Sequence, residues 1–352
     1  MELKANLWYN LIWYLGTREY KNVKSVSISL ILIVTVTIPF TNGCKKKPPH
    51  ELVSTCSVRE LEQLINNGLD VNAKNEKGRT LLHKAAVECR KEVVEFLIAR
   101  GANVNARDYL DYMPLHVSVD KSYIRDDRFV SNKEVVEILI SSGAEINAKA
   151  TRGSTPLYIV ASTPSLDIIE ILVENGADVN AVNTKGETAL YRAAALGDKQ
   201  ITEFLIKNGA RVDVKNKEGV TPLHIAAENN HNNVTEVLKL LIENGAQVNA
   251  GDETGTTPLI DAVTSGSKSG QLEVAAVLLA NGANPNIGDN RGLTPLHFAS
   301  FLTGNKDMIE LLISNGADIN IRDNSGETPL GVAIGNGRKE IATLLSKLGA
   351  KE

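Results

Sequence analysis

The stretch "GVTPLHIAAE", residues 219–228, decides the fold of this 352-residue chain. Thr221 can cap a helix by accepting a hydrogen bond from an unpaired backbone N–H, and Pro222 at the first helical position loses no bond that it would have made. Leu223 and the following Ala-Ala pair give the helix a small apolar face that suits close packing. The stretch therefore predicts a short, buried helix that begins after Thr221.

The same motif recurs along the chain, always twelve residues after a glycine. Successive glycines from Gly68 to Gly349 are 33, 42, 33, 33, 36, 37, 34 and 33 residues apart, and all but the first are followed by alanine. A fixed period of this length predicts a repeat array rather than several unrelated domains. The copies of the motif are TLLH (80–83), MPLH (113–116), TPLY (155–158), TALY (188–191), TPLH (221–224), TPLI (257–260), TPLH (294–297) and TPLG (328–331).

Each unit reads as a helix, a turn, a second helix and a finger. The second helix has apolar residues three or four apart, as in EVVEFLIARG (92–101), and ends at a glycine able to adopt the left-handed conformation. Segments such as NAKNEKG (72–78) then supply the Asn, Asp and Gly that tight turns need. Because the gap between glycine and motif never varies, we expect the fingers to stack in register.

The length variation falls elsewhere in the unit. The extra residues near 120–132, 229–233 and 265–270 all fit the turn between the two helices. A surface turn tolerates added residues at small entropic cost, so these insertions should decorate one edge of the array without bending it.

The pattern resembles the ankyrin repeat in its G-x-TPLHxAA core, its 33-residue period and its GADVNA exit (176–181). The resemblance covers residues 50–352, as eight repeats preceded by a partial one in which SVRE (57–60) fits a capping box. It implies an all-α solenoid of helix-turn-helix repeats joined by hairpin-like fingers. It also implies that a partner binds the concave face formed by the fingers and the first helices.

Composition argues against several classes of function. The 38 basic and 42 acidic side chains give a net charge of −4 and form no long blocks, so nothing indicates a nucleic-acid partner. No serine-histidine-aspartate ordering, phosphate loop, HExxH or paired-carboxylate motif stands out. We therefore expect a binding protein rather than an enzyme, with no cofactor and no metal.

Four of the six histidines occupy the last position of the motif: His83, His116, His224 and His297. Their even spacing invites a metal or acid-base interpretation. However, tyrosine, isoleucine or glycine takes the same position in other repeats. We interpret these histidines as hydrogen-bonded fixtures of the repeat.

The chain has three cysteines, and two of them, Cys56 and Cys89, lie 33 residues apart at the same site of adjacent repeats. Equivalent points on stacked helices are about 8 to 10 Å apart, whereas a disulfide usually needs Cα atoms within about 7 Å. We therefore expect two thiols, although an oxidising compartment would leave their oxidation state open.

Repeat 2 departs from the pattern at its fingertip, RDYLDYMPLH (107–116). Tyr109, Leu110 and Tyr112 place apolar and aromatic groups where the other repeats have a polar tip and glycine, and aromatic residues are frequent binding hot spots. The long turn of the same repeat adds Tyr123 and Phe129, and the alternative is that this turn folds back over the fingertip. We predict that the fingertip binds the partner.

The ankyrin resemblance adds candidate contacts on the concave face. These are the residue before the motif, such as Arg79 and Leu293, and the residue after it, such as Lys84, Arg192 and Phe298. Their chemistry is mixed, which suits a folded protein partner better than a polyanion. We expect the chain to act as a monomer.

The first 43 residues read as a membrane-targeting segment. Residues 25–40 carry no charge and follow Arg18, Lys21 and Lys24, but sixteen helical residues span only about 24 Å of a hydrocarbon core of about 30 Å. That length suits a signal peptide. The TNGC (41–44) that follows is similar to the lipobox of bacterial lipoproteins, in which the cysteine is lipidated.

This resemblance makes Cys44 the candidate lipid acceptor and KKKPP (45–49) the rest of a short tether, 44–49. Thr41 stands where leucine is usual, so an uncleaved signal anchor, ordinary secretion or no export stay open. The segment before Val23 is overlong for a signal peptide; it is either the result of a wrong start site or an interfacial helix using Trp8 and Trp13.

Together these features predict a scaffold or adaptor protein held at a bacterial membrane, with its repeats outside the cytoplasm. One alternative is an inhibitor or immunity protein that blocks an enzyme or toxin in the cell envelope. An enzyme with a site assembled across repeats is a third. The partner and the membrane face stay open.

Overall fold

The computed structural model describes residues 49–122, 132–229, 234–265, 268–303 and 306–351. Within these ranges the chain forms eighteen α-helices and no strand. The predicted targeting segment, Cys44, both tryptophans, Tyr123 and Phe129 lie outside the described residues. The predicted all-α class is confirmed, and the first described helix begins at Pro49, the last residue of the predicted tether.

The helices alternate between first and second members of a repeat. The first helices are α2 (Pro49–Thr55), α4 (Leu81–Val87), α6 (Pro114–Val119), α8 (Pro156–Val160), α10 (Ala189–Leu196), α12 (Pro222–Glu228), α14 (Pro258–Thr264), α16 (Pro295–Phe298) and α18 (Pro329–Gly335). The second helices are α3 (Val58–Asn66), α5 (Lys91–Ala99), α7 (Lys133–Ser141), α9 (Leu166–Glu174), α11 (Lys199–Lys207), α13 (Val234–Glu243), α15 (Lys268–Ala280), α17 (Lys306–Ser314) and α19 (Lys339–Lys347). A 3₁₀ turn, η2 (Thr151–Gly153), lies in the third finger, and a π-helical segment, η3 (Ala299–Thr303), continues α16.

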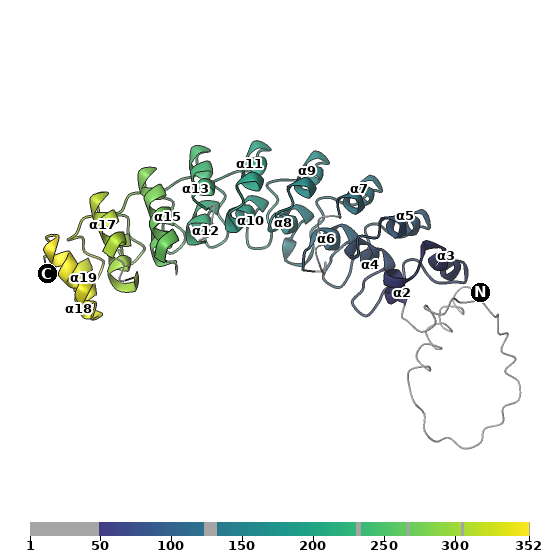
Figure 1. Cartoon of the computed structure of the whole chain (residues 1–352), viewed down its shortest axis with the longest axis horizontal. Coiled ribbons are helices and arrows are strands. Elements are labelled where there is room, and N and C mark those ends of the chain that lie inside the picture. Colours follow the sequence, from purple (N-terminus) through teal and green to yellow (C-terminus); the bar gives the residue numbers. More distant parts are fainter. Residues whose placement is uncertain (1–48, 123–131, 230–233, 266–267, 304–305, 352) are drawn as a thin grey trace, which may run out of the picture.

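The repeats stack into a single arc (Figure 1). Helices α3 to α13 of the second set follow the convex edge, and α2 to α12 of the first set follow the concave edge. We number the repeats 1 to 8 by their motifs, from Thr80 to Thr328, and give each finger the number of the motif that follows it. The pair α2 and α3 precedes repeat 1 and has no such motif.

Local capping starts the helices where the sequence predicts. The Thr221 side chain accepts from the His224 N–H, and Pro222 occupies the first turn of α12. Ser57 and Glu60 form the predicted capping box at α3. At the other end of the second helices, Gly101 has φ of 85°, in the left-handed region that a side chain disfavours. Each motif thus sets a helix boundary by local chemistry alone.

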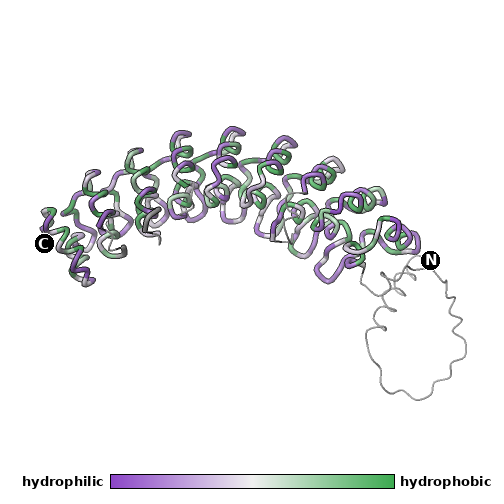
Figure 2. The backbone as a smooth tube through the Cα atoms, viewed as in Figure 1, coloured by the Kyte–Doolittle hydropathy of each residue, from purple (hydrophilic) through white to green (hydrophobic). Residues whose placement is uncertain are grey.

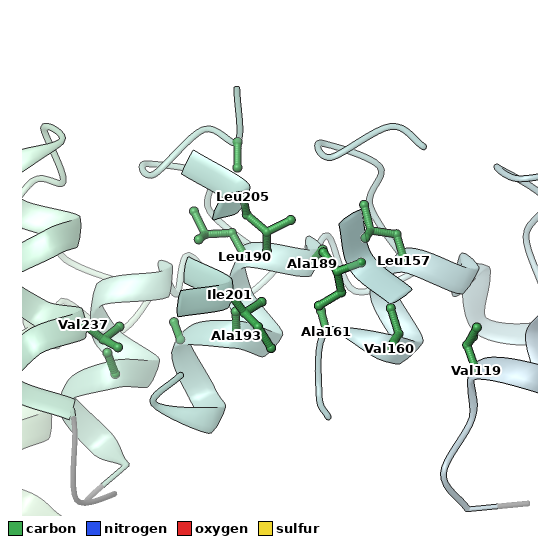
Figure 3. Close-up of a cluster of buried hydrophobic side chains, with 14 of the residues drawn as sticks. Val119, Leu157, Val160, Ala161, Ala189, Leu190, Ala193, Ile201, Leu205 and Val237 are labelled. Carbon is green, nitrogen blue, oxygen red and sulfur yellow. The ribbon is translucent and has the colours of Figure 1, made fainter. Parts of the chain in front are cut away.

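The core is one continuous cluster of buried side chains, from Leu52 to Leu345. Figure 3 shows its middle section, where side chains from α6 to α13 follow one another, among them Leu157, Leu190 and Leu205. Figure 2 shows hydrophobic stretches inside the helix pairs and hydrophilic ones along the exposed loops. Since each repeat buries its apolar face against the next, the array closes its own core.

Two insertions lie between the helices of their repeats, as predicted: 120–132 falls between α6 and α7, and 229–233 between α12 and α13. The prediction is wrong for part of 265–270. Residues 268–270 belong to α15, which has 13 residues where most second helices have nine. The added residues extend the helix by about one turn instead of enlarging the loop. In the described part of the chain, every helix is too short or too polar to cross a bilayer.

Candidate protein-binding surface

The fingers form a ladder of backbone hydrogen bonds along the array. At each junction between successive fingers, one tip N–H donates to a tip carbonyl of the preceding finger, as from Lys217 to Lys185 at 2.8 Å. The other donors are Tyr109, Thr151, Thr184, Glu253, Asn290 and Asn324, with distances of 2.8 to 3.1 Å. An inserted residue would break this register, which explains the constant gap between glycine and motif.

An asparagine at the base of most fingers clamps adjacent repeats. Asn180 donates from Nδ2 to the Gly209 carbonyl at 2.8 Å, and its Oδ1 accepts from the Arg211 N–H at 2.9 Å. The same pair of bonds is made by Asn72, Asn105, Asn147, Asn249 and Asn286. Repeat 5 has Asp213 at this position, and its side chain makes no hydrogen bond among the described residues.

The four motif histidines link their repeats to the next finger. In His224 the Nδ1 atom accepts from the Thr221 N–H at 3.2 Å, so Nε2 carries the proton and donates to the Thr256 carbonyl at 3.0 Å. His83, His116 and His297 make equivalent bonds. Burial lowers the pKa of His83 and of His116 to about 4 and lowers the pKa of the other two. These neutral rings are structural, as predicted, and serve as inter-repeat bonds.

Two concave candidates from the N-terminal repeats form ion pairs within the chain. Lys84 of α4 pairs with Glu88, the residue that follows the helix, at 2.8 Å. Arg79 pairs across fingers with the buried Asp108 at 3.1 Å. Both cations are therefore neutralised by the chain itself before any partner arrives.

The candidates of the later repeats are placed differently. Arg192 lies over the Tyr158 ring, with its Cζ 5.4 Å from the ring centroid. The Cζ of Arg291 likewise lies over the Phe298 ring, 5.9 Å from its centroid. Both Arg192 and Phe298 are half-buried on the first helices of their repeats. Leu293, which is also half-buried, lies in the finger just before the motif of repeat 7. Lys84, Arg192 and Phe298 occupy the same position of three repeats, so the stack places them in one row.

The repeat 2 fingertip divides into an exposed and a packed part. Tyr109 is 74% exposed and Leu110 is 48% exposed, although the Tyr109 ring rests on the backbone at Gly78. Tyr112 is half-buried, packs on the core and lies 5.5 Å from the His116 ring. Tyr109 and Leu110 are thus available to a partner, whereas Tyr112 also supports the fold.

Three polar residues on the concave side add to the contacts named above, and two of them, Glu187 and Asp261, occupy the predicted positions before and after a motif. Tyr158 replaces the motif histidine in repeat 3, and its hydroxyl donates to Glu187 Oε2 at 2.5 Å. Asp261 follows the motif of repeat 6, in the same row as Arg192, and burial raises its pKa to about 8. The signal was present in the alignment of repeats, because a carboxylate at that position occurs once in eight copies.

The described residues hold no metal site, and two open hollows lie away from the concave row. Those residues contain no group of three or more His, Cys, Asp or Glu side chains arranged to hold a metal ion. A hollow of about 510 Å³ lies at the start of α11, beside Asp198 and Glu236. A second, of about 570 Å³, lies between α15 and α17. Both lie against second helices, away from the concave row.

The cysteines depart from the prediction at one position. Cys89 is a thiol that donates to the Val87 carbonyl, but Cys56 is disulfide-bonded, so the expectation of two thiols is wrong for Cys56. Cys56 is fully buried between α2 and α3, and its partner sulfur is not that of Cys89. The spacing of stacked helices correctly argued against a Cys56–Cys89 bond, but it did not address bonds to other sulfurs.

Comparison with known proteins agrees with the repeat architecture. A family model described as "Ankyrin repeats (3 copies)" matches residues 27–125, 128–216, 197–289 and 267–352. An ankyrin repeat protein of Fowlpox virus (strain NVSL) is 42% identical over 60 residues, which cover 16% of this chain and 12% of that protein.

Two further relatives share similarly short stretches. The RelA-associated inhibitor of Mus musculus is 41% identical over 56 residues, covering 16% of this chain and 7% of that protein. A protein of Dictyostelium discoideum that is named as a serine/threonine-protein kinase is 36% identical over 74 residues, covering 20% of this chain and 8% of its own length. The chain thus spans only a small fraction of these relatives. From the family match and the geometry of the stack, this chain belongs to the ankyrin-repeat family, whose repeats form protein–protein interaction modules.

Proposed function

We propose that this chain is a scaffold or adaptor that holds a protein partner at a bacterial membrane. The observation that carries the proposal is the concave face of the array, where half-buried side chains of mixed chemistry line the first helices of successive repeats. Interfaces between proteins combine apolar, aromatic and arginine side chains in this way. The mechanism is surface complementarity across several repeats, without catalysis.

The names of the relatives favour binding over catalysis, without indicating a particular partner. The murine relative is named as an inhibitor associated with another protein, which agrees with action by binding. The match to the relative named as a kinase covers only 8% of that protein, so we do not assign kinase activity to this chain. A binding module remains the function that the concave surface supports best.

The proposed membrane attachment rests on the sequence of the segment before Pro49. Cys44 follows an uncharged stretch of signal-peptide length and is the proposed lipid acceptor, with 45–49 as a tether. Lysines in such a tether would favour an anionic lipid surface. Under this proposal the repeats work outside the cytoplasm, in the cell envelope.

Fatty-acid labelling tests the lipid proposal at Cys44. The full chain and the Cys44→Ser variant are compared, and labelling lost in the variant supports the lipid. Equal labelling in both, or no labelling of either, contradicts it.

A pull-down from envelope extract tests the binding proposal. Residues 45–352 are suitable bait because the core from Leu52 to Leu345 closes on itself. The matched variant is Tyr109→Ser, which changes an exposed fingertip, and Lys207→Ser on the convex helix α11 is the control. A partner retained by wild type and by the control but reduced with Tyr109→Ser supports the scaffold. No specific partner, or one equally reduced by the control, counts against it.

The second candidate function is an inhibitor or immunity protein for an enzyme or toxin of the envelope. The same concave face would serve, because a curved repeat array can cover an active site. Addition of residues 45–352 to the purified partner separates the two functions. Loss of the partner's activity in proportion to the bound fraction supports the inhibitor, whereas full activity in the complex supports the scaffold.

A further inference from the structure

One row of side chains along the concave face alternates between apolar and charged groups. It consists of the residue that follows the motif in repeats 3 to 7: Ile159, Arg192, Ile225, Asp261 and Phe298. All five are half-buried and lie on or beside consecutive first helices, α8 to α16. The row therefore places one cation and one carboxylate two repeats apart, with an isoleucine between them.

Arg192 has no anionic partner in the part of the chain that the structure describes. Its Nε is buried and makes no hydrogen bond, while its guanidinium lies over the Tyr158 ring. The nearby carboxylate of Glu187 is held by neutral donors instead, the Tyr158 hydroxyl at 2.5 Å and Asn183 Nδ2 at 2.8 Å. A buried guanidinium N–H without an acceptor costs stability, so an acceptor supplied from outside would relieve it.

Asp261 is the counterpart of opposite sign. Its carboxylate makes no hydrogen bond or ion pair among the described residues, and the charged groups nearest to it are Glu228 and Asp252. Burial and these two like charges raise its pKa to about 8. With this pKa the side chain is mostly protonated at pH 7 in the free chain, and a cation arriving from outside would stabilise its ionised form.

The N-terminal part of the concave face offers a contrast. Lys84 occupies the same row position in repeat 1, but it forms an ion pair with Glu88 at 2.8 Å. Arg79 pairs with Asp108 in the same way across two fingers. The chain pairs its own concave charges there. Arg192 in repeat 4 and Asp261 in repeat 6, by contrast, have no ionic partner among the described residues.

The spacing sets the dimensions of a ligand. Stacked helices lie about 8 to 10 Å apart, so Arg192 and Asp261 are separated by about 20 Å. An extended segment covers that distance with about six residues and a helix with about thirteen. Ile225 lies between the two charges, and Ile159 and Phe298 lie outside them, so the spaces around the charges favour apolar side chains.

We infer that the partner docks on repeats 3 to 7 through a segment that places an acidic side chain on Arg192 and a basic side chain on Asp261, with an apolar side chain between them on Ile225. Because the two charges differ in sign, the segment can lie in only one direction. This inference rests on the proposed protein-binding function and adds the chemistry and the orientation of the partner.

Selection from a random peptide library tests the inference without knowledge of the partner. A phage library of 16-residue peptides is selected on immobilised 45–352, and the winners are sequenced. The expected winners share an acidic and a basic position at one fixed separation. The variant Arg192→Glu/Asp261→Lys reverses both charges of the row, and the peptides selected on it should carry their two charges in the opposite order.

Affinity measurements with one synthesised peptide from the selection complete the test. Arg192→Glu should weaken binding about tenfold or more, since it places like charges together in a partly buried site, and Asp261→Lys should do the same. Lys207→Glu, which reverses an exposed charge on the convex helix α11, should leave the affinity within about twofold. Winners without the charge pair, an order unchanged by the double reversal, or no enrichment at all would overturn the inference.

The envelope pull-down separates this outcome from the proposed function. A partner captured equally by wild type and by Arg192→Glu/Asp261→Lys would leave the scaffold function intact and refute the inferred contact. A partner lost only with the charge variants, while circular dichroism shows an unchanged fold, supports both.

Discussion

The imidazole of His83 joins two repeats, because its Nε2–H donates to the backbone carbonyl of Tyr112 in the next finger at 3.0 Å. Its Nδ1 accepts from the Thr80 N–H of its own motif at 3.1 Å, which fixes the tautomer. A single side chain therefore satisfies a helix cap and an inter-repeat bond. Both functions depend on a neutral ring.

Replacement of His83 by alanine should lower the free energy of unfolding by about 1 to 3 kcal/mol. The variant leaves a buried carbonyl at Tyr112 and the N–H of Thr80 without their partners. Urea unfolding followed by circular dichroism at 222 nm measures the change. Lys207→Ala serves as the control, because Lys207 is exposed on α11; a loss for His83→Ala no larger than for this control would show that the link is dispensable.

Acid should weaken the array through the same histidines. The pKa of His83 and of His116 is about 4 in the folded chain, below the ordinary value of 6.5, because burial disfavours the charged ring. Unfolding therefore takes up protons, and the stabilisation is complete above pH 6.5 and falls as pH decreases towards 4. Melting temperature measured from pH 7 to pH 4 should drop, and the drop should be smaller in His83→Gln/His116→Gln, which cannot titrate. Parallel curves would contradict the assignment.

Asp261 should show the opposite dependence on pH. Its folded pKa of about 8 lies above the ordinary 3.8, since burial and the charges of Glu228 and Asp252 disfavour ionisation. Its contribution to stability is thus complete below pH 3.8 and is lost as pH rises through 8. The gain in melting temperature of Asp261→Asn over wild type should therefore be larger at pH 8.5 than at pH 4.5. An equal gain at both values would show that the carboxylate is ionised throughout.

Asp213→Asn should stabilise the junction between repeats 5 and 6. Asn180 shows the clamp that the variant would restore, with one bond to a glycine carbonyl and one from a backbone N–H. Asp213 is exposed and has no amide hydrogen to donate to the equivalent Gly245 carbonyl. We expect a gain of about 1 kcal/mol in urea unfolding. Asp213→Ser, which removes the charge without the amide, is the control, and an equal gain in both variants would point to charge alone.

The two tyrosines of the repeat 2 fingertip should separate stability from binding. Tyr109→Ser should change the free energy of unfolding by less than about 0.5 kcal/mol, because most of the side chain already contacts solvent. Tyr112→Ser should cost about 1 to 3 kcal/mol, since its half-buried ring packs on the core and beside His116. Thermal melts of the two variants measure the difference. Equal losses would place Tyr109 in the core.

The chain by itself determined the repeat architecture, because its signals are local. Thr221 and Pro222 start a helix, Gly245 ends one, and the constant gap of twelve residues fixes the fingers in register. These choices depend on backbone conformations and on side chains within a few residues. Eight copies of the same local solution then leave stacking as the only way to bury the apolar faces.

Only the tertiary structure decided which polar residues are satisfied. Lys84, Arg192 and Asp261 follow the motif in the same way, yet Lys84 is paired with Glu88 while Arg192 and Asp261 have no ionic partner among the described residues. The Lys84–Glu88 pair is local, four residues apart, whereas the groups around Arg192 and Asp261 come from preceding repeats more than thirty residues away: Tyr158 beneath Arg192, and Glu228 acting on Asp261. In the same way, burial separated Tyr112 from Tyr109. Burial and ionic partnership are properties of surfaces brought together by the stack, so no single repeat could specify them.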